Sequence, residues 1–159
     1  MSGSRICLAI VASLGATALP AATPTSEFRT VPPEQIVWQP VPDSFGVESA
    51  LLSGDPSKPG TYVIRVRFPP HVMDRPHSHS GDRYVTVVKG VWSAGTGPGF
   101  DPAKAVQLKA GSFMFHPAGG VHWDGSNSNE EAVVQIIGQG PVSSTNLDSK
   151  LPSWVRVEN

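Results

Sequence analysis

Short apolar segments separated by glycine and proline limit what this chain can fold into. The 159 residues include 16 glycines and 16 prolines, which favour turns and disfavour helix interiors. In the clearest segment, residues 61–68, alternate positions from Tyr62 to Phe68 are apolar, and Arg65 and Arg67 lie between them. A period of two with polar residues on one side predicts a half-buried strand. Many such segments predict an all-β sandwich or barrel without long helices.

Further strands are expected wherever β-branched or aromatic residues cluster between turn residues. The chain length of 159 residues suits a single domain, and no repeat occurs at the periods of solenoid proteins. We expect the large apolar side chains within these segments to form most of the core. The expected strands are 36–38, 47–52, 84–88, 91–92, 105–108, 112–115 and 131–137, and the expected core residues include Tyr62, Trp92, Phe113, Met114 and Phe115.

The first 22 residues predict an export signal. Arg5 supplies a positive charge, residues 6–14 form an apolar run too short to span a bilayer, and residues 16–18 are small, as at a cleavage site. A buried N-terminal helix is the alternative. Residues 23–33 are rich in Pro and Thr and predict an extended arm. The protein is therefore expected in the periplasm or outside the cell, without a membrane anchor after cleavage.

The charge balance argues against several classes of partner. The net charge is −1 and the pI is about 6.5, so the basic footprint of a nucleic-acid-binding protein is missing. The glycine-rich stretch 95–99 contains Pro98 and no lysine, unlike a phosphate-binding loop. We expect a small-molecule ligand or substrate as the partner. A homodimer is also expected, because the extended arm could pair with the sheet edge of a second copy.

All five histidines lie between positions 71 and 122. His77 and His79 are two positions apart, so on a strand they face the same side at a spacing of about 7 Å. Two imidazoles on one face can converge on a divalent ion, and imidazole suits Zn, Fe, Ni, Cu and Mn to different degrees. Alone, however, this pair fits two solvated loop histidines better than a metal site.

A second segment of the sequence favours the metal site over the two solvated histidines. Residues 111–122 form a strand, a Pro-Gly turn and then a histidine, with glycine or proline at regular positions. This segment resembles the second motif of the cupin superfamily, which is Gly, five residues, Pro, any residue, Gly, two residues and His. Gly111, Pro117, Gly119 and His122 match it position for position. The optional Asn four residues beyond the histidine is replaced by Ser126.

The first cupin motif is matched less completely. It reads Gly, five residues, His-x-His, three or four residues, Glu, six residues and Gly. His77, His79 and Gly90 fit this pattern, but His71 occupies the position of the first Gly and Arg83 that of the Glu. The resemblance is closest to small single-domain bacterial cupins of uncharacterised type.

The resemblance implies a fold and a metal site. The fold would be all-β and single-domain, the cupin double-stranded β-helix or jelly-roll barrel, over residues 34–142. Residues 143–159 would form a polar C-terminal tail. His77, His79 and His122 would hold a divalent metal ion, with Fe, Zn, Mn and Ni as the candidates.

The missing glutamate leaves two alternatives for the metal. Asp82, one position early, could supply a shorter carboxylate ligand. The preferred alternative is a site of three histidines and waters, as in the thiol dioxygenase branch of the superfamily. Arg83 either faces inward, where it could clamp a substrate carboxylate, or faces outward and pairs with Asp82 or Asp74.

Two further side chains near the motif are open to several interpretations. His116 could be a partner of a ligand, a general base, a fourth ligand or a rim histidine without a role. Asp124 could orient His122, although capping the turn at 125–127 is the safer interpretation. The expected function is a metal-dependent oxygenase, isomerase or lyase acting on a small polar molecule, assisted by Arg83 or His116. A non-catalytic ligand-binding or structural cupin is the alternative.

Overall fold

The computed structural model describes residues 27–158, and the part from Val31 onward forms one unit. Apart from two short 3₁₀ turns, Pro33–Gln35 (η1) and Pro102–Lys104 (η2), its regular structure is β-strand, which confirms the all-β prediction. None of the helices in the described part is long and apolar enough to cross a membrane. The predicted export signal, residues 1–22, lies outside the described residues, as do residues 23–26 of the expected arm.

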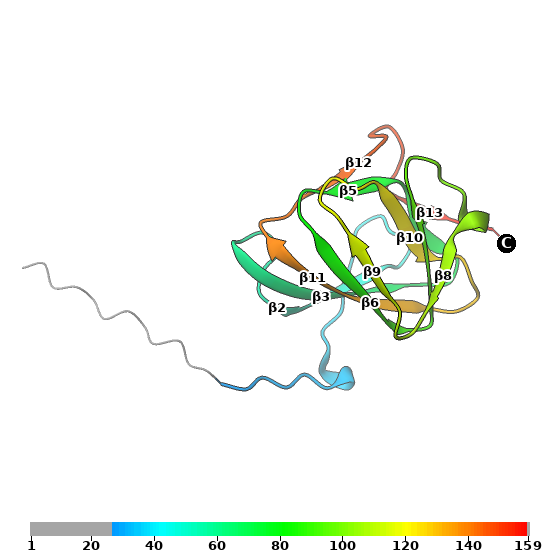
Figure 1. The fold of residues 1–159 in the computed structure, drawn as a ribbon. Coiled ribbons are helices and arrows are strands. Elements are labelled where there is room, and N and C mark those ends of the chain that lie inside the picture. The colour runs from blue at the N-terminus through cyan, green and yellow to red at the C-terminus, as the bar shows by residue number, and fades with distance from the viewer. Residues whose placement is uncertain (1–26, 159) are drawn as a thin grey trace, which may run out of the picture. The chain divides into compact units, whose positions relative to one another are not determined.

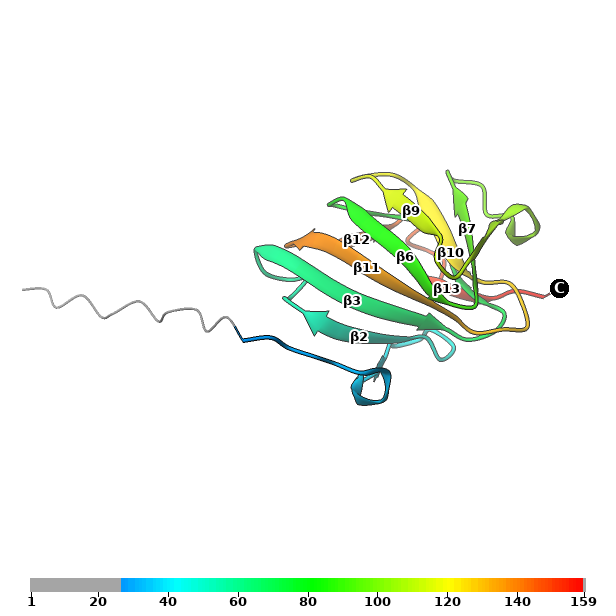
Figure 2. The same cartoon turned by 60° about the horizontal axis from the view of Figure 1, so that its bottom comes forward.

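Two antiparallel sheets build the barrel (Figure 1). In the first sheet, β3 and β11 pair over nine residues each and form the long centre, which Figure 2 shows face-on. In order across this sheet, the strands are β1 (Gln39–Pro40), β2 (Glu48–Ser53), β3 (Gly60–Phe68), β11 (Ala132–Gly140), β6 (Arg83–Lys89) and β9 (Phe113–His116).

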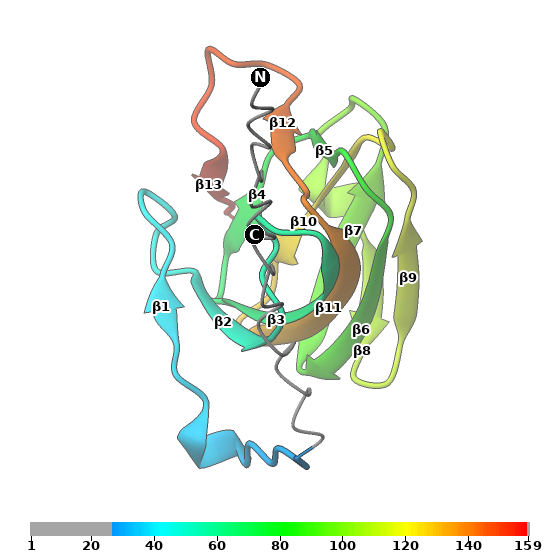
Figure 3. The same cartoon turned by 90° about the vertical axis from the view of Figure 1, so that its left-hand side faces the viewer.

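The second sheet consists of shorter strands and faces the first across the core (Figure 3). β10 lies at its centre and pairs with three other strands. The strands are β12 (Ser144–Asn146), β5 (His77–His79), β10 (His122–Ser126), β4 (Val72–Asp74) and β13 (Trp154–Arg156), together with β7 (Val91–Thr96), which pairs with β10, and β8 (Val106–Lys109), which pairs with β7.

The stretch 143–159, expected to be a polar tail, contributes two strands to this second sheet. β12 pairs with β5, and β13 pairs with β4. Strands of three residues carry too little periodic pattern to be predicted, and their partners lie more than 60 positions earlier in the chain. The expected strand at 36–38 is also displaced, since β1 begins at Gln39.

The core between the sheets confirms the alternation predicted for β3. Tyr62 and Phe68 are buried, whereas Arg65 on the opposite face donates a hydrogen bond to the side chain of Gln135 on β11 (3.1 Å). The buried core members come mostly from the strands of both sheets. They are Val47, Tyr62, Phe68, Val72, Val85, Val87, Trp92, Ala94, Ala132, Val134 and Ile136.

Two residues expected in the core lie outside it. Phe113 and Phe115 are 58% and 43% exposed, and both pack against Tyr84 on the outer face of the first sheet. The reason is the period of two along β9: Met114 and His116 point inward, so the two phenylalanines must point outward.

The motif glycines share one backbone property. Gly90, Gly111 and Gly119 all adopt positive φ, at 72°, 91° and 74°. Other residue types avoid this region because of their Cβ atom. His71, which stands at the first glycine position of the motif, also has a positive φ of 59°. The left-handed turn is therefore kept although the glycine is not.

Candidate metal centre

The structure brings the three predicted ligands together. β5 carries His77 and His79, and β10 places His122 directly opposite His77 in the antiparallel register. One nitrogen from each of the three rings lies within 4.8 Å of the others. His77 and His122 are buried, with exposures of 7% and 3%, and His79 is half-buried. Strand geometry alone therefore gathers three imidazoles in the barrel interior.

Backbone carbonyls orient two of these rings in the same way. The Nδ1 atom of His77 donates to the carbonyl of Arg75, and that of His122 donates to the carbonyl of Gly120, each at 2.9 Å. A carbonyl oxygen only accepts, so Nδ1 carries the proton and Nε2 presents a lone pair. The Nε2 atom of His122 is buried and has no hydrogen-bond partner. This is the arrangement that metal-ligating histidines require.

The third ring completes a cluster of lone pairs. The Nε2 atom of His79 lies 3.1 Å from that of His77 and also contacts the guanidinium of Arg83. Because a guanidinium only donates, His79 Nε2 also presents a lone pair. Two lone pairs thus face each other at 3.1 Å, and a shared cation would satisfy both. The donor set therefore fits a divalent metal ion.

Protonation agrees with this assignment. Burial and then the charge of Arg83 lower the pKa of His79 to about 2. Burial also lowers the pKa of His77, although the nearby carboxylate of Asp124 acts in the opposite direction. Both rings are consequently neutral near pH 7, as metal ligands must be.

Two buried carboxylates lie beside the histidines. The side chain of Asp124 accepts a hydrogen bond from the indole N–H of Trp92 (3.0 Å), so its expected role as a turn cap is wrong. Its Oδ2 atom is 3.9 Å from His122 Nε2, and Asp74 Oδ2 is 3.6 Å from His77 Nδ1. Burial and the charge of Asp124 raise the pKa of Asp74 well above its usual range.

The sequence suggests Asp74 only as an ion-pair partner of an outward-facing Arg83. Its only local signal is its place after the apolar pair Val72–Met73, which indicates a short buried strand. The two carboxylates extend the candidate metal centre, because two further groups could hold an ion. These are His116, His122 and Asp124, and Asp74, His77 and Asp124.

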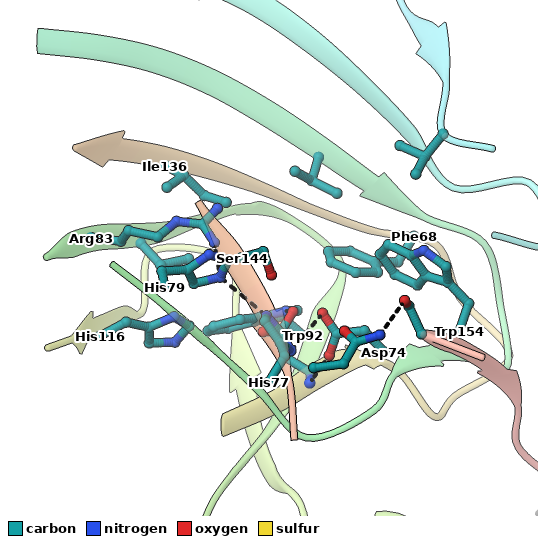
Figure 4. A pocket seen from close by; sticks show the side chains of 16 residues that line it. Phe68, Asp74, His77, His79, Arg83, Trp92, His116, Ile136, Ser144 and Trp154 are labelled. Atoms are coloured by element: carbon teal, nitrogen blue, oxygen red, sulfur yellow. Dashed lines mark hydrogen bonds and ion pairs between the residues drawn. The ribbon is translucent and has the colours of Figure 1, made fainter. Parts of the chain in front are cut away.

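Arg83 and Asp82 point in different directions at the start of β6. The guanidinium of Arg83 lines the cavity above His79 (Figure 4), as in the inward alternative. Asp82 is exposed and accepts a hydrogen bond from the backbone N–H of Ala118 (2.7 Å). Among the described residues, Asp82 belongs to none of the groups that could hold a metal. It braces the turn of the second motif instead of supplying the missing carboxylate.

The charge of Arg83 persists in this environment. Burial lowers the pKa of its guanidinium, whereas Tyr62, Asp124 and Asp74 act in the opposite direction. A guanidinium remains protonated in proteins because its ordinary pKa exceeds 12. The cavity therefore contains a permanent positive charge in the position where the motif has a negative one.

His116 is a buried member of the same cluster and not a rim residue. It ends β9 opposite Arg83 in the register, and it is only 3% exposed. Its ring centroid lies 3.8 Å from that of His122, and the ring stacks on Trp92 at 5.9 Å. Neither ring nitrogen has a hydrogen-bond partner. Burial lowers its pKa to about 4, so the ring is neutral near pH 7.

A cavity of about 260 Å³ opens onto this cluster (Figure 4). His77, His79, Arg83 and His116 line it, and the buried ring of His122 lies beside those of His77 and His116, with centroids 4.4 and 3.8 Å away. The acidic side chains of Asp74 and Asp124 also line the cavity. The rest of the lining includes apolar side chains such as Phe68, Ile136 and Trp154, and polar side chains from β12 and the residue before β13, which are Ser144, Asn146 and Ser153.

Solved structures share this fold. An RmlC-like cupin protein from Ralstonia eutropha aligns with a TM-score of 0.59 and 21% identity, covering 82% of this chain and 80% of its own. The polyketide cyclase RemF from Streptomyces resistomycificus aligns with a TM-score of 0.61 and 14% identity, covering 80% and 96%. The DMSP lyase DddQ from Ruegeria pomeroyi aligns with a TM-score of 0.58 and 13% identity, covering 72% and 62%. These identities establish the fold alone.

Sequence comparison defines the family more closely. No curated protein matches the chain in sequence. A family model described as "ChrR Cupin-like domain" matches residues 26–143, a range that includes both histidine motifs and most of the barrel. The chain therefore belongs to the ChrR cupin-like family of the cupin superfamily.

Proposed function

We propose that this cupin is a metal-dependent enzyme that acts on a small polar molecule by lyase, isomerase or oxygenase chemistry. The observation that carries the proposal is the convergence of three imidazole lone pairs, from His77, His79 and His122, beside a cavity with polar and apolar walls. Convergent polar groups in a concave, partly apolar pocket are the usual features of a small-molecule site.

The residues around the cavity have separable tasks. The carbonyls of Arg75 and Gly120 hold the ligand rings of His77 and His122 so that their lone pairs face one point. A divalent ion held there would supply Lewis acidity or a site for O₂. Neutral His116 has two unpartnered nitrogens and can accept a proton from a substrate in the cavity.

The structural neighbours support this choice of chemistry at the level of the fold. One is named as a lyase and another as a cyclase, so the same barrel carries small-molecule chemistry elsewhere. Fold likeness does not transfer a substrate. Small acids and alcohols that can eliminate or isomerise are therefore a reasonable first set for an activity screen.

Elemental analysis of protein purified without an affinity tag tests the proposal. We expect about one Fe, Zn, Mn or Ni ion per chain, lost in His77→Ala and His122→Ala. His71→Ala is the matched control, because His71 bonds to Asn129 and belongs to none of the candidate metal groups. The proposal fails if the wild-type protein contains no metal and binds none of these four ions when they are added.

A non-catalytic cupin is the second candidate, because Arg83 already contacts a ligand nitrogen of His79. In a purely structural role, metal removal would lower the melting temperature without any ligand changing it. An enzyme or ligand-binding protein would instead show a further stability increase with its small molecule, in proportion to ligand concentration.

Export and dimerisation remain proposals of their own. The charged, apolar and small-residue pattern of residues 1–22 supports export to the periplasm or beyond. N-terminal sequencing of the protein from a periplasmic fraction would test it. Light scattering of the purified protein would test the homodimer, and a monomeric mass would contradict it.

A further inference from the structure

Arg83 is a half-buried cation without a carboxylate in direct contact, although Asp124 and Asp74 lie near enough to favour its charge. Among the described residues, no carboxylate lies within ion-pair distance of its guanidinium, and its Nε atom is buried without a hydrogen-bond partner. The side chains that it does contact, Tyr62 and His79, are not carboxylates. Burying an unpaired charge is costly, so this arrangement points to an anion that binds beside Arg83.

The same guanidinium competes with a metal ion. It donates toward the His79 Nε2 lone pair, which a cation bound by the three histidines would also need. One lone pair cannot serve both, and the two positive charges repel each other at this range. Binding of the cation therefore requires that the guanidinium leave His79 and find another acceptor.

The cavity limits what that acceptor can be. Asp82 accepts a hydrogen bond from the backbone of Ala118 and does not line the cavity. Among the described residues, the two acidic side chains that do line it, Asp124 and Asp74, already accept hydrogen bonds, from the indole of Trp92 and from the backbone N–H of Asp124. A guanidinium fork matches a planar carboxylate in a bidentate geometry. The volume of about 260 Å³ and the apolar lining residues Phe68, Ile136 and Trp154 suit a small molecule with a short apolar part. Because the described residues that line the cavity include a single guanidinium, one carboxylate group on the ligand is enough to neutralise it.

We propose that the ligand of this site is a small monocarboxylate that pairs with Arg83 and binds cooperatively with the metal ion. This inference rests on the metal site of the proposed function. The carboxylate takes the guanidinium away from His79 and neutralises it, so each ligand raises the affinity for the other. By linkage, the two increases must be equal.

Zinc affinity, measured by competition with a chromophoric chelator, tests the coupling. For the wild-type protein we expect acetate to lower the Kd for Zn²⁺ by about tenfold, a typical coupling. Acetamide, which has the same shape and no charge, should leave it unchanged. Arg83→Gln should bind zinc more tightly than the wild type without acetate and should not respond to acetate.

Two further variants distinguish an effect of the Arg83 charge in the cavity from a general effect of changing the charge of the protein. Arg65→Gln removes the same charge from the outer face of the barrel and should retain the acetate response, since Arg65 pairs with Gln135 away from the cavity. Arg83→Glu returns the carboxylate of the motif and should give the tightest zinc binding with no acetate response.

The outcomes distinguish this inference from the proposed function. If the wild-type protein binds no zinc or other candidate ion, the metal proposal fails and this inference fails with it. If zinc binds with one Kd whether acetate is present or absent, the metal site stands and the carboxylate proposal is overturned. If Arg83→Gln does not fold, the comparison of acetate with acetamide in the wild-type protein decides the question by itself.

Discussion

The backbone N–H of Asp124 donates a 2.7 Å hydrogen bond to the buried carboxylate of Asp74, 50 positions earlier in the chain. Asp124 in turn accepts a hydrogen bond from the indole of Trp92. These bonds join β4, β10 and β7 next to His77 and His122. A buried polar network of this kind can hold the adjacent histidines in place only while each of its polar groups has a hydrogen-bond partner.

Removing the indole donor should destabilise the barrel. Trp92→Phe keeps an aromatic ring but leaves the buried Asp124 carboxylate without its donor, and it also leaves unfilled volume. We expect a loss of about 2–3 kcal/mol in the free energy of unfolding, measured in urea. Trp154→Phe is the control, because Trp154 packs on Phe68 and is only partly buried. Equal losses in the two variants would show that the hydrogen bond contributes nothing.

Replacing His116 should separate stability from function. Both of its nitrogens are buried without partners, so each has lost its hydrogen bonds with water. His116→Phe removes this cost and should stabilise the protein by about 1–2 kcal/mol. Turnover of any substrate found in the activity screen should fall, because the proton acceptor is lost. A destabilised variant that retains full turnover would contradict this assignment.

The metal-free protein should lose stability as the pH falls from about 6.5 to 4. The folded-state pKa values of His79 and His116 are about 2 and 4, below the unfolded value, so the unfolded chain binds more protons in this range. Each such histidine contributes up to about 1.4 kcal/mol per pH unit. In EDTA, His79→Gln should reduce the slope of the unfolding free energy against pH by about that amount.

Asp74 should have the opposite effect on the pH dependence of the unfolding free energy, so a variant of Asp74 is the matched comparison. Its raised pKa keeps a proton in the folded state that the unfolded chain releases above about pH 4, so its contribution favours folding as the pH falls. Asp74→Asn removes this opposing contribution and should steepen the slope. Identical slopes in the wild-type protein and both variants would show that neither group is perturbed by folding.

The backbone at His71 should discriminate between residue types. Its φ of 59° is tolerated by Asn and His but strongly disfavoured for β-branched residues. We expect the free energy of unfolding of His71→Val to be about 1–2 kcal/mol lower than that of His71→Asn, as measured by urea denaturation. Equal stability of the two variants would mean that the turn relaxes to an ordinary conformation.

Features that depend on neighbouring residues could be predicted from the sequence. The alternation along residues 61–68 determines which side of β3 is buried, because successive side chains on a strand point to opposite faces. The spacing of Gly111, Pro117, Gly119 and His122 indicated the turn that leads into β10, and Gly111 and Gly119 adopt the positive φ that such turns need. The placement of His77 and His79 on one strand followed from the same local geometry.

Other features depend on which strands become neighbours. The side of the barrel that Arg83 faces, the burial of Asp74 beside Asp124, and the pairing of β12 with β5 all depend on this. The sequence by itself determined the strands, the motif turns and the histidines that can meet. Only the tertiary structure decided that Arg83 enters the cavity while Asp82 holds a turn. Contacts between distant strands depend on register, which no local pattern contains.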